Sequence, residues 1–193
     1  ALRDFTGRHY GQDPSIKFWR LSRNRLKKKI NPHTATVSAL VFSRNGRYMA
    51  SGSLDKTVKL WSSSRTKHLR TFQKHPAGIV SLGFSPDGRL LATGSYDNSV
   101  RIWRTSDGTL VNSRAAHKYS VNKVAFSADG RVLATTGGGS ILGFWSVPDL
   151  RPLKKIRVPG GQIRALAFSP VTGLFATGGS DHAVRMYRLV DFR

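Results

Sequence analysis

A repeat of 42 residues runs through the chain and constrains its fold more than any other feature. The clearest unit extends from His75 to Trp103, and a shift of 42 positions in either direction aligns it with further units without a gap. One repeat position holds all four tryptophans, Trp19, Trp61, Trp103 and Trp145. A fixed period of about 20 to 50 residues is typical of repeat architectures, in which each unit buries its apolar face against its neighbours.

Each unit has the pattern of four short strands. Val80, Leu82 and Phe84 alternate with small residues, which predicts a first strand and lets another sheet approach closely. Ser85-Pro86-Asp87-Gly88 follows, and its composition suits a hairpin turn. The remaining pattern predicts a second strand at 90–95, a third at 99–103 and a fourth, more polar strand within 104–116. Four strands in about 42 residues make one blade of a β-propeller.

These units resemble WD repeats, and the resemblance covers almost the entire chain. It implies an all-β propeller with about four complete repeats and part of a fifth. The single propeller region then spans residues 1–193, with a partial unit at 1–32 and further units at 33–74, 75–116, 117–158 and 159–193. The chain begins in the middle of a unit, so we expect it to start inside a longer protein.

The family's commonest ring has seven blades, which at 42 residues each would need about 294 residues, whereas the chain has 193. We therefore expect a partial ring that is completed by further blades outside this sequence or by another chain. An open ring would leave an apolar flank exposed.

The resemblance also implies a hydrogen-bonded network of His, Ser or Thr, Asp and Trp inside each blade. Such a network is reasonable chemistry, because a partly buried carboxylate needs donors and an indole N–H needs an acceptor. In this sequence the matching positions are His33, Ser51, Asp55 and Trp61; His75, Thr93, Asp97 and Trp103; His117, Thr135 and Trp145; and Thr177 and Asp181.

Two units depart from this pattern. The third has Gly139 at the Asp position, and the fourth has Pro159 and Tyr187 at the His and Trp positions. We expect incomplete networks in these two blades, which should be locally weaker or supported by a partner.

The charge is strongly positive: 32 basic residues against 10 acidic ones give a net charge of +22, and Glu is absent. A polyanionic partner is the default inference. The basic residues concentrate after the Trp position, in the segment expected to form the outermost strand. Lysines on an edge strand also prevent sheets from pairing edge to edge, but one or two per strand suffice for that.

The densest clusters are therefore candidate sites for phosphate backbone, without base reading. They comprise Arg20, Arg23, Arg25, Lys27, Lys28 and Lys29; Arg65, Lys67 and Arg70; and Arg151, Lys154, Lys155 and Arg157. Leu26 and Ile30 flank the lysine triplet and are expected to anchor its strand.

Signs of catalysis are missing from the sequence. It contains no Gly-Lys-Ser or Gly-Lys-Thr phosphate loop and no zinc-protease pair of histidines, and Gly137-Gly138-Gly139 fits a turn between strands. The recurring Ser, His and Asp fit a structural network better than a triad, because a catalytic site needs one exposed nucleophile. We expect no cofactor, no metal and no small-molecule substrate.

A few side chains fall outside these patterns. His68 and His182 are expected at the surface, and Met49 and Met186 in the core. Candidates for stacking on single-stranded bases are few, namely Tyr10, Tyr96 and Tyr119.

Together these features predict a non-catalytic WD-repeat scaffold that binds other protein subunits of a large assembly. Its basic rim would contact RNA backbone in a ribonucleoprotein or a ribosome, including an organellar one. The alternative is a cytoskeletal or ciliary WD-repeat protein whose basic surface faces the acidic surface of microtubules. With no apolar run of about 18 residues, no membrane association is expected. The expected location is intracellular, in the cytoplasm or the mitochondrion.

Overall fold

The computed structural model describes residues 13–189, and in them every regular element but one is a β-strand. The exception is a single 3-10 turn, η1 (Leu21–Arg23). No helix in these residues is long and apolar enough to cross a lipid bilayer. The predicted all-β fold is therefore confirmed.

The strands form five antiparallel sheets, which we call blades 1 to 5 in chain order. Blade 1 pairs β1 (Ile16–Arg20) with β2 (Arg25–Ile30). Blade 2 contains β3 (Val37–Phe42), β4 (Tyr48–Ser53), β5 (Val58–Ser62) and β6 (Lys67–Thr71). Blade 3 contains β7 (Ile79–Phe84), β8 (Leu90–Ser95), β9 (Ser99–Arg104) and β10 (Leu110–Ala115). Blade 4 contains β11 (Val121–Phe126), β12 (Val132–Gly137), β13 (Ile141–Ser146) and β14 (Pro152–Arg157). Blade 5 contains β15 (Ile163–Phe168), β16 (Leu174–Gly179) and β17 (Val184–Arg188).

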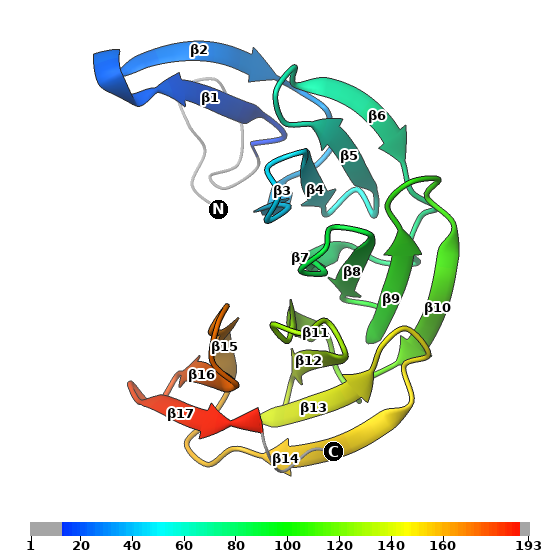
Figure 1. Cartoon of the computed structure of the whole chain (residues 1–193), viewed down its shortest axis with the longest axis vertical. Coiled ribbons are helices and arrows are strands. Elements are labelled where there is room, and N and C mark those ends of the chain that lie inside the picture. The colour runs from blue at the N-terminus through cyan, green and yellow to red at the C-terminus, as the bar shows by residue number, and fades with distance from the viewer. Residues whose placement is uncertain (1–12, 190–193) are drawn as a thin grey trace, which may run out of the picture.

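The blades follow one another around an open arc (Figure 1). Strands β3, β7, β11 and β15 line its inner side, and β2, β6, β10 and β14 form its outer side. Neighbouring blades contact each other through their inner strands: β7 contacts β3 and β4, β11 contacts β7 and β8, and β15 contacts β11 and β12. The fourth strand of a blade is thus its outermost strand, as predicted.

The predicted turn between first and second strands is present, and its side chains stabilise it locally. In blade 3 the Ser85 hydroxyl donates to Asp87 Oδ1 at 2.6 Å, and Gly88 adopts φ +72°, a conformation that favours glycine. Blade 4 repeats the hydrogen bond with Ser127 and Asp129. Local turn chemistry therefore sets the pairing of the first two strands.

The apolar core lies between blades rather than within one sheet. Leu60 of blade 2 and Ile79 of blade 3 are fully buried in the same cluster as Trp103. Gly52 on β4 makes the close approach possible, because a Cβ there would lie 2.6 Å from Ile79 Cγ2. Small residues on the sheet face thus let the next sheet pack closely, as expected.

Apolar side chains whose repeat equivalents are buried are exposed on blade 2, beside the two-stranded blade 1, and on blade 5. Leu40 is 50% exposed and Phe42 60%, whereas their equivalents Leu82 and Phe126 are each 8% exposed. On blade 5 Met186 is 70% exposed, so its predicted core position is wrong. The reason is that no further blade of the described residues covers that face of blade 5. The apolar flank expected of an open ring is present.

Candidate functional site

The polar residues that recur every 42 positions meet inside blade 3. His75 Nε2 lies 2.8 Å from the Thr93 hydroxyl, and His75 Nδ1 lies 2.9 Å from Asp97 Oδ2. The indole N–H of Trp103 donates to Thr93 Oγ1 at 3.0 Å. The ionised Asp97 carboxylate can only accept, so the neutral His75 ring carries its proton on Nδ1 and donates it to Asp97. Nε2 then accepts from the Thr93 hydroxyl, whose oxygen accepts from the indole.

Blade 2 repeats this arrangement with serine in place of threonine. His33 Nε2 lies 2.9 Å from the Ser51 hydroxyl, which also accepts from the Trp61 indole N–H at 3.0 Å. His33 Nδ1 lies 2.9 Å from Asp55 Oδ2, and the Thr57 hydroxyl donates to Asp55 Oδ1 at 2.6 Å. Blades 2 and 3 therefore both contain a complete chain of donors and acceptors.

These networks keep the aspartates ionised and the histidines neutral. Burial alone raises the pKa of Asp55, but hydrogen bonds from the side chain and backbone of Thr57, from the Thr34 N–H and from His33 outweigh it and lower the pKa to about 2. Burial lowers the pKa of His33, and its hydrogen bond to Asp55 compensates only in part. The Ser51 hydroxyl is fully buried and already engaged, so it is not placed to attack a substrate. The arrangement suits stability of the blade, not catalysis.

Blade 4 retains only part of the network. His117 Nε2 lies 2.7 Å from Thr135 Oγ1, which accepts from the Trp145 indole N–H at 2.8 Å. Gly139 takes the place of the aspartate, so no carboxylate of the described residues pairs with His117. Burial and the nearby charge of Lys155 lower the pKa of His117 to about 4.

Blade 5 has no such network, as its substitutions suggested. Thr177 is buried, but no hydrogen bond among residues 13–189 joins it to Asp181, so the structure does not bring these two predicted members together. The Asp181 carboxylate instead pairs with Arg185 at 2.6 Å. At the tryptophan position Tyr187 stacks on Phe175, with ring centroids 5.0 Å apart. At this position of blade 5, aromatic packing takes the place of the hydrogen bond that the tryptophan indole makes in blades 2, 3 and 4.

The first predicted basic cluster lies on blade 1, where its side chains are exposed. Four of them, with Leu26, line a cavity of about 240 Å³ at the β1–β2 hairpin: Arg20, Arg23, Arg25 and Lys27. Ile30 packs beside buried Ile16 and anchors the end of β2 as expected. Leu26 is 40% exposed, so its predicted anchoring role is wrong. The inner strands that cover this position in other blades are not among the described residues.

The second basic cluster joins the first across the boundary between blades 1 and 2. Lys28 Nζ donates to Thr66 Oγ1 at 2.9 Å, and Arg65 and Lys67 are exposed on either side of Thr66. We call the combined surface the basic rim; it consists of Arg20, Arg23, Arg25, Lys27, Lys28, Lys29, Arg65 and Lys67. Within residues 13–189, no carboxylate forms an ion pair with any of these eight side chains.

Arg70, which the sequence placed in the second cluster, is engaged elsewhere. Its side chain is half-buried and its guanidinium donates to the backbone carbonyl of Ser106 in blade 3. Asn112, at the same repeat position in blade 3, donates to the carbonyl of Asp149 in blade 4 at 2.8 Å. Arg70 therefore takes part in a contact between blades and does not belong to the basic rim.

The third basic cluster, on β14, does not form one patch. Arg151 precedes the strand and lies 4.0 Å from Asp149, whereas Arg157 ends it, roughly 20 Å away at the rise of an extended strand. Lys154 is exposed between them. Lys155 lies over the Trp145 ring, 5.3 Å from its centroid. Lys155 and Arg157 line a cavity of about 390 Å³ beside His117.

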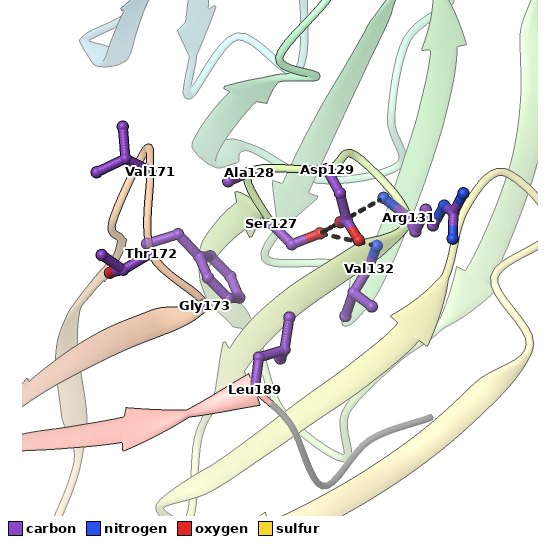
Figure 2. Close-up of a pocket in the computed structure, with 10 residues that line it drawn as sticks. Ser127, Ala128, Asp129, Arg131, Val132, Val171, Thr172, Gly173 and Leu189 are labelled. Atoms are coloured by element: carbon purple, nitrogen blue, oxygen red, sulfur yellow. Dashed lines mark hydrogen bonds between the residues drawn. The ribbon is translucent and has the colours of Figure 1, made fainter.

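A cavity of about 510 Å³ between blades 4 and 5 was not predicted (Figure 2). Asp129 and Arg131 come from the β11–β12 turn, and Val171 comes from the β15–β16 turn. A sequence signal exists, because Val171-Thr172 stands where blade 4 has Asp129-Gly130. The Asp129 carboxylate already accepts from the Ser127 hydroxyl and the Arg131 N–H. These polar groups are satisfied within their own turn, so they give the cavity no specific chemistry.

The remaining candidates are dispersed. Tyr96 and Tyr119 are exposed on different blades, and Tyr10 lies outside the described residues. His182 is exposed as expected, and the exposed ring of His68 packs edge-on against Trp61 at 5.1 Å. No aromatic platform for bases is formed by the described tyrosines.

Comparison with protein families gives four consecutive matches to the WD domain, G-beta repeat, at residues 24–62, 66–104, 108–146 and 150–188. Each match begins with the outer strand of one blade and ends with the third strand of the next; the first, for example, covers β2 to β5. One sequence repeat therefore contributes strands to two neighbouring blades. No curated protein matches the chain significantly.

Proposed function

Because the chain belongs to the WD-repeat family, we propose that it is a non-catalytic scaffold that binds other protein subunits of a large assembly and contacts RNA backbone through its basic rim. The scaffold part follows from the family, whose blades present rigid surfaces to protein partners. The RNA part is carried by one observation, the basic rim itself.

The basic rim has the properties of a surface that binds phosphate. Its eight cations are exposed, they extend over two adjacent blades, and no carboxylate in residues 13–189 neutralises them. Protection of an edge strand needs fewer charges than this. Unpaired cations this close together repel one another, and a polyanion would relieve that repulsion. Backbone contact requires no base-reading groups, which agrees with the dispersed tyrosines.

The test replaces Lys27, Lys28 and Lys29 together with alanine and measures binding to a labelled 20-nucleotide poly(U) RNA at several salt concentrations. Each lost phosphate contact should lower the slope of log K against log salt by about 0.7, so the triple variant should lose about 2. The matched control replaces Arg89, Arg131 and Arg164, which are exposed on blades 3, 4 and 5, outside the basic rim. It removes the same charge and should change the slope little.

Three results would refute RNA binding by the basic rim. Wild-type binding could be independent of salt, or the lysine triple variant could bind RNA as tightly as wild type. Both triple variants could also weaken binding equally, which would indicate net charge and not a defined surface. Co-sedimentation with microtubules but no binding to RNA would favour the acidic tubulin surface as the partner.

A further inference from the structure

Blade 4 has lost the carboxylate that blades 2 and 3 hold beside their histidine. In those blades an aspartate oxygen lies 2.9 Å from His Nδ1. In blade 4 the corresponding residue is Gly139, and a Cβ built there would meet nothing within 4 Å. Blade 4 therefore has no carboxylate at this turn, and the backbone there also differs, because Gly139 has φ +84° whereas Asp55 and Asp97 do not have a positive φ.

Blade 4 keeps the contacts that hold the histidine ring in blades 2 and 3. Thr135 Oγ1 accepts from the Trp145 indole at 2.8 Å and lies 2.7 Å from His117 Nε2. With the Thr135 hydroxyl donating to Nε2, as Thr93 does to His75 in blade 3, the neutral ring carries its proton on Nδ1. The His117 side chain is 92% buried, since its exposed fraction is 8%, yet it lines the cavity of about 390 Å³. In that tautomer, Nδ1–H is a donor for an acceptor in the cavity.

The cavity has also gained positive charge relative to the complete blades. Three basic residues line it together with His117: Lys118, Lys155 and Arg157. One blade earlier, the same repeat positions hold the uncharged residues Pro76, Ser113 and Ala115. Among residues 13–189, none of the three basic side chains forms an ion pair. The loss of one carboxylate therefore coincides with the gain of three cations that line a cavity beside His117.

Lys155 also compensates for a second substitution in the same blade. The third strand of blade 3 carries Arg101, which lies over the Trp103 ring at 5.9 Å, and blade 4 has Gly143 at that position. Lys155 is the cross-strand partner of Gly143 and lies over the Trp145 ring at 5.3 Å. The lysine is thus held at the edge of the cavity by its contact with the indole.

We propose that this cavity binds a carboxylate from an acidic side chain of a protein partner, which takes the place of the missing aspartate. A carboxylate fits because the equivalent nitrogen in blade 3, His75 Nδ1, donates to the carboxylate of Asp97, and the equivalent threonine and tryptophan hold its ring. The proposal rests on the scaffold function for its protein partner, but it is independent of RNA binding by the basic rim. Three exposed cations would attract the acidic segment, and His117 would fix the carboxylate.

Nuclear magnetic resonance of isotope-labelled histidine tests the site in the full chain. Sodium acetate, at ionic strength held constant with sodium chloride, should shift the His117 ring signals saturably over a millimolar range and raise the pKa of His117. A tetraglutamate peptide should give the same shift at lower concentration. The charged residues that line the cavity with His117 are Lys118, Lys155 and Arg157, so a bound anion would bring the first negative charge to this lining.

Two variants of Gly139 make the test specific. Gly139→Asp supplies the carboxylate within the chain, so it should abolish the response to acetate and raise the pKa of His117 without ligand. Gly139→Ala is the control, because it places a side chain at the same positive φ of +84° but leaves the cavity open; it should respond like wild type. Lys155→Met should weaken acetate binding about threefold to tenfold.

Several outcomes would overturn the proposal. One is the absence of a saturable shift at His117 in the wild-type protein. Another is equal acetate affinity in the Asp and Ala variants of Gly139. A response to inorganic phosphate or poly(U) RNA without a response to acetate would assign the cavity to phosphate instead. The lysine triple variant of the basic rim should respond to acetate like wild type, so failure of RNA binding and failure of this site are distinguishable.

Discussion

Replacement of Thr93 with valine tests how much the buried network of blade 3 contributes to folding. The substitution keeps the shape of the side chain but removes the hydroxyl that accepts from the Trp103 indole and donates to His75 Nε2. Thr93, His75 and Trp103 are all at least 98% buried, with exposed fractions of 0%, 2% and 0%. Water therefore cannot replace the lost partner without opening the blade.

The expected loss of stability follows from the two groups left without a partner. Each unsatisfied buried polar group costs about 1 to 3 kcal/mol. The added methyl group returns about 0.8 kcal/mol of apolar burial. We therefore expect Thr93→Val to lower the free energy of unfolding by about 1 to 5 kcal/mol.

Urea unfolding at pH 7, followed by circular dichroism and tryptophan fluorescence, measures this change. With an m-value of about 2 to 3 kcal/mol/M, the midpoint should fall by about 1 M urea. Thr136→Val is a matched control, because the Thr136 hydroxyl is equally buried but has no hydrogen-bond partner among the described residues. That variant should be as stable as wild type or slightly more stable.

The reasoning fails if Thr93→Val unfolds at the same urea concentration as Thr136→Val. It also fails if the m-value changes while the midpoint does not, because the effect would then lie in the unfolded state or in a loss of cooperativity.

Three further measurements probe other parts of the structure. Gly137→Ala should destabilise the protein by about 1 to 3 kcal/mol, because a Cβ at this position would lie 2.2 Å from His117 Cγ. Gly173→Ala is the control: a Cβ there would have no atom within 4 Å, so the melting temperature should change little. Phe175→Ala should lower the free energy of unfolding, measured by chemical denaturation, by about 3 to 5 kcal/mol, since Phe175 is 1% exposed. Phe42→Ala should lower it far less, because Phe42 is 60% exposed. Equal losses of stability would contradict the assigned core. The pKa of His117 is about 4 in the folded protein, below its ordinary value of about 6.5, so the unfolded chain binds more protons between these two pH values. The free energy of unfolding should therefore fall by about 3 kcal/mol as the pH drops from 6.5 to 4. Denaturation of His117→Asn at both pH values checks this, and an unchanged pH dependence would refute it.

The strands and turns of the blades were largely predictable from the sequence. The turn at Ser85–Gly88 and the second strand at Leu90–Ser95 lie where the residue pattern placed them. These features depend on residues close together in the chain, namely a side chain that closes its own turn and alternation along one strand. The hydrogen bonds of His33 and His75 also lie at the positions that the resemblance implied.

The roles of exposed residues were less predictable, because they depend on what lies across a blade boundary. Met186 has the character of a core residue, but no described blade covers it. Arg70 looked like another rim cation, but its guanidinium reaches the Ser106 carbonyl of the next blade. Residue type and strand position are the same whether or not a neighbouring sheet covers the side chain, so the pattern could not distinguish these cases.

By itself, the sequence determined the blade: a 42-residue repeat, four strand segments, and a polar network where all four residue types are present. The tertiary structure decided which charges act together. The hydrogen bond from Lys28 to Thr66 joins two clusters into one basic rim, whereas Arg151 precedes β14 and Arg157 ends it. It also placed three cations of blade 4 around a cavity beside His117. The physical reason is that a blade is specified by contacts within about 42 residues, while a binding surface depends on how the sheets are arranged against one another.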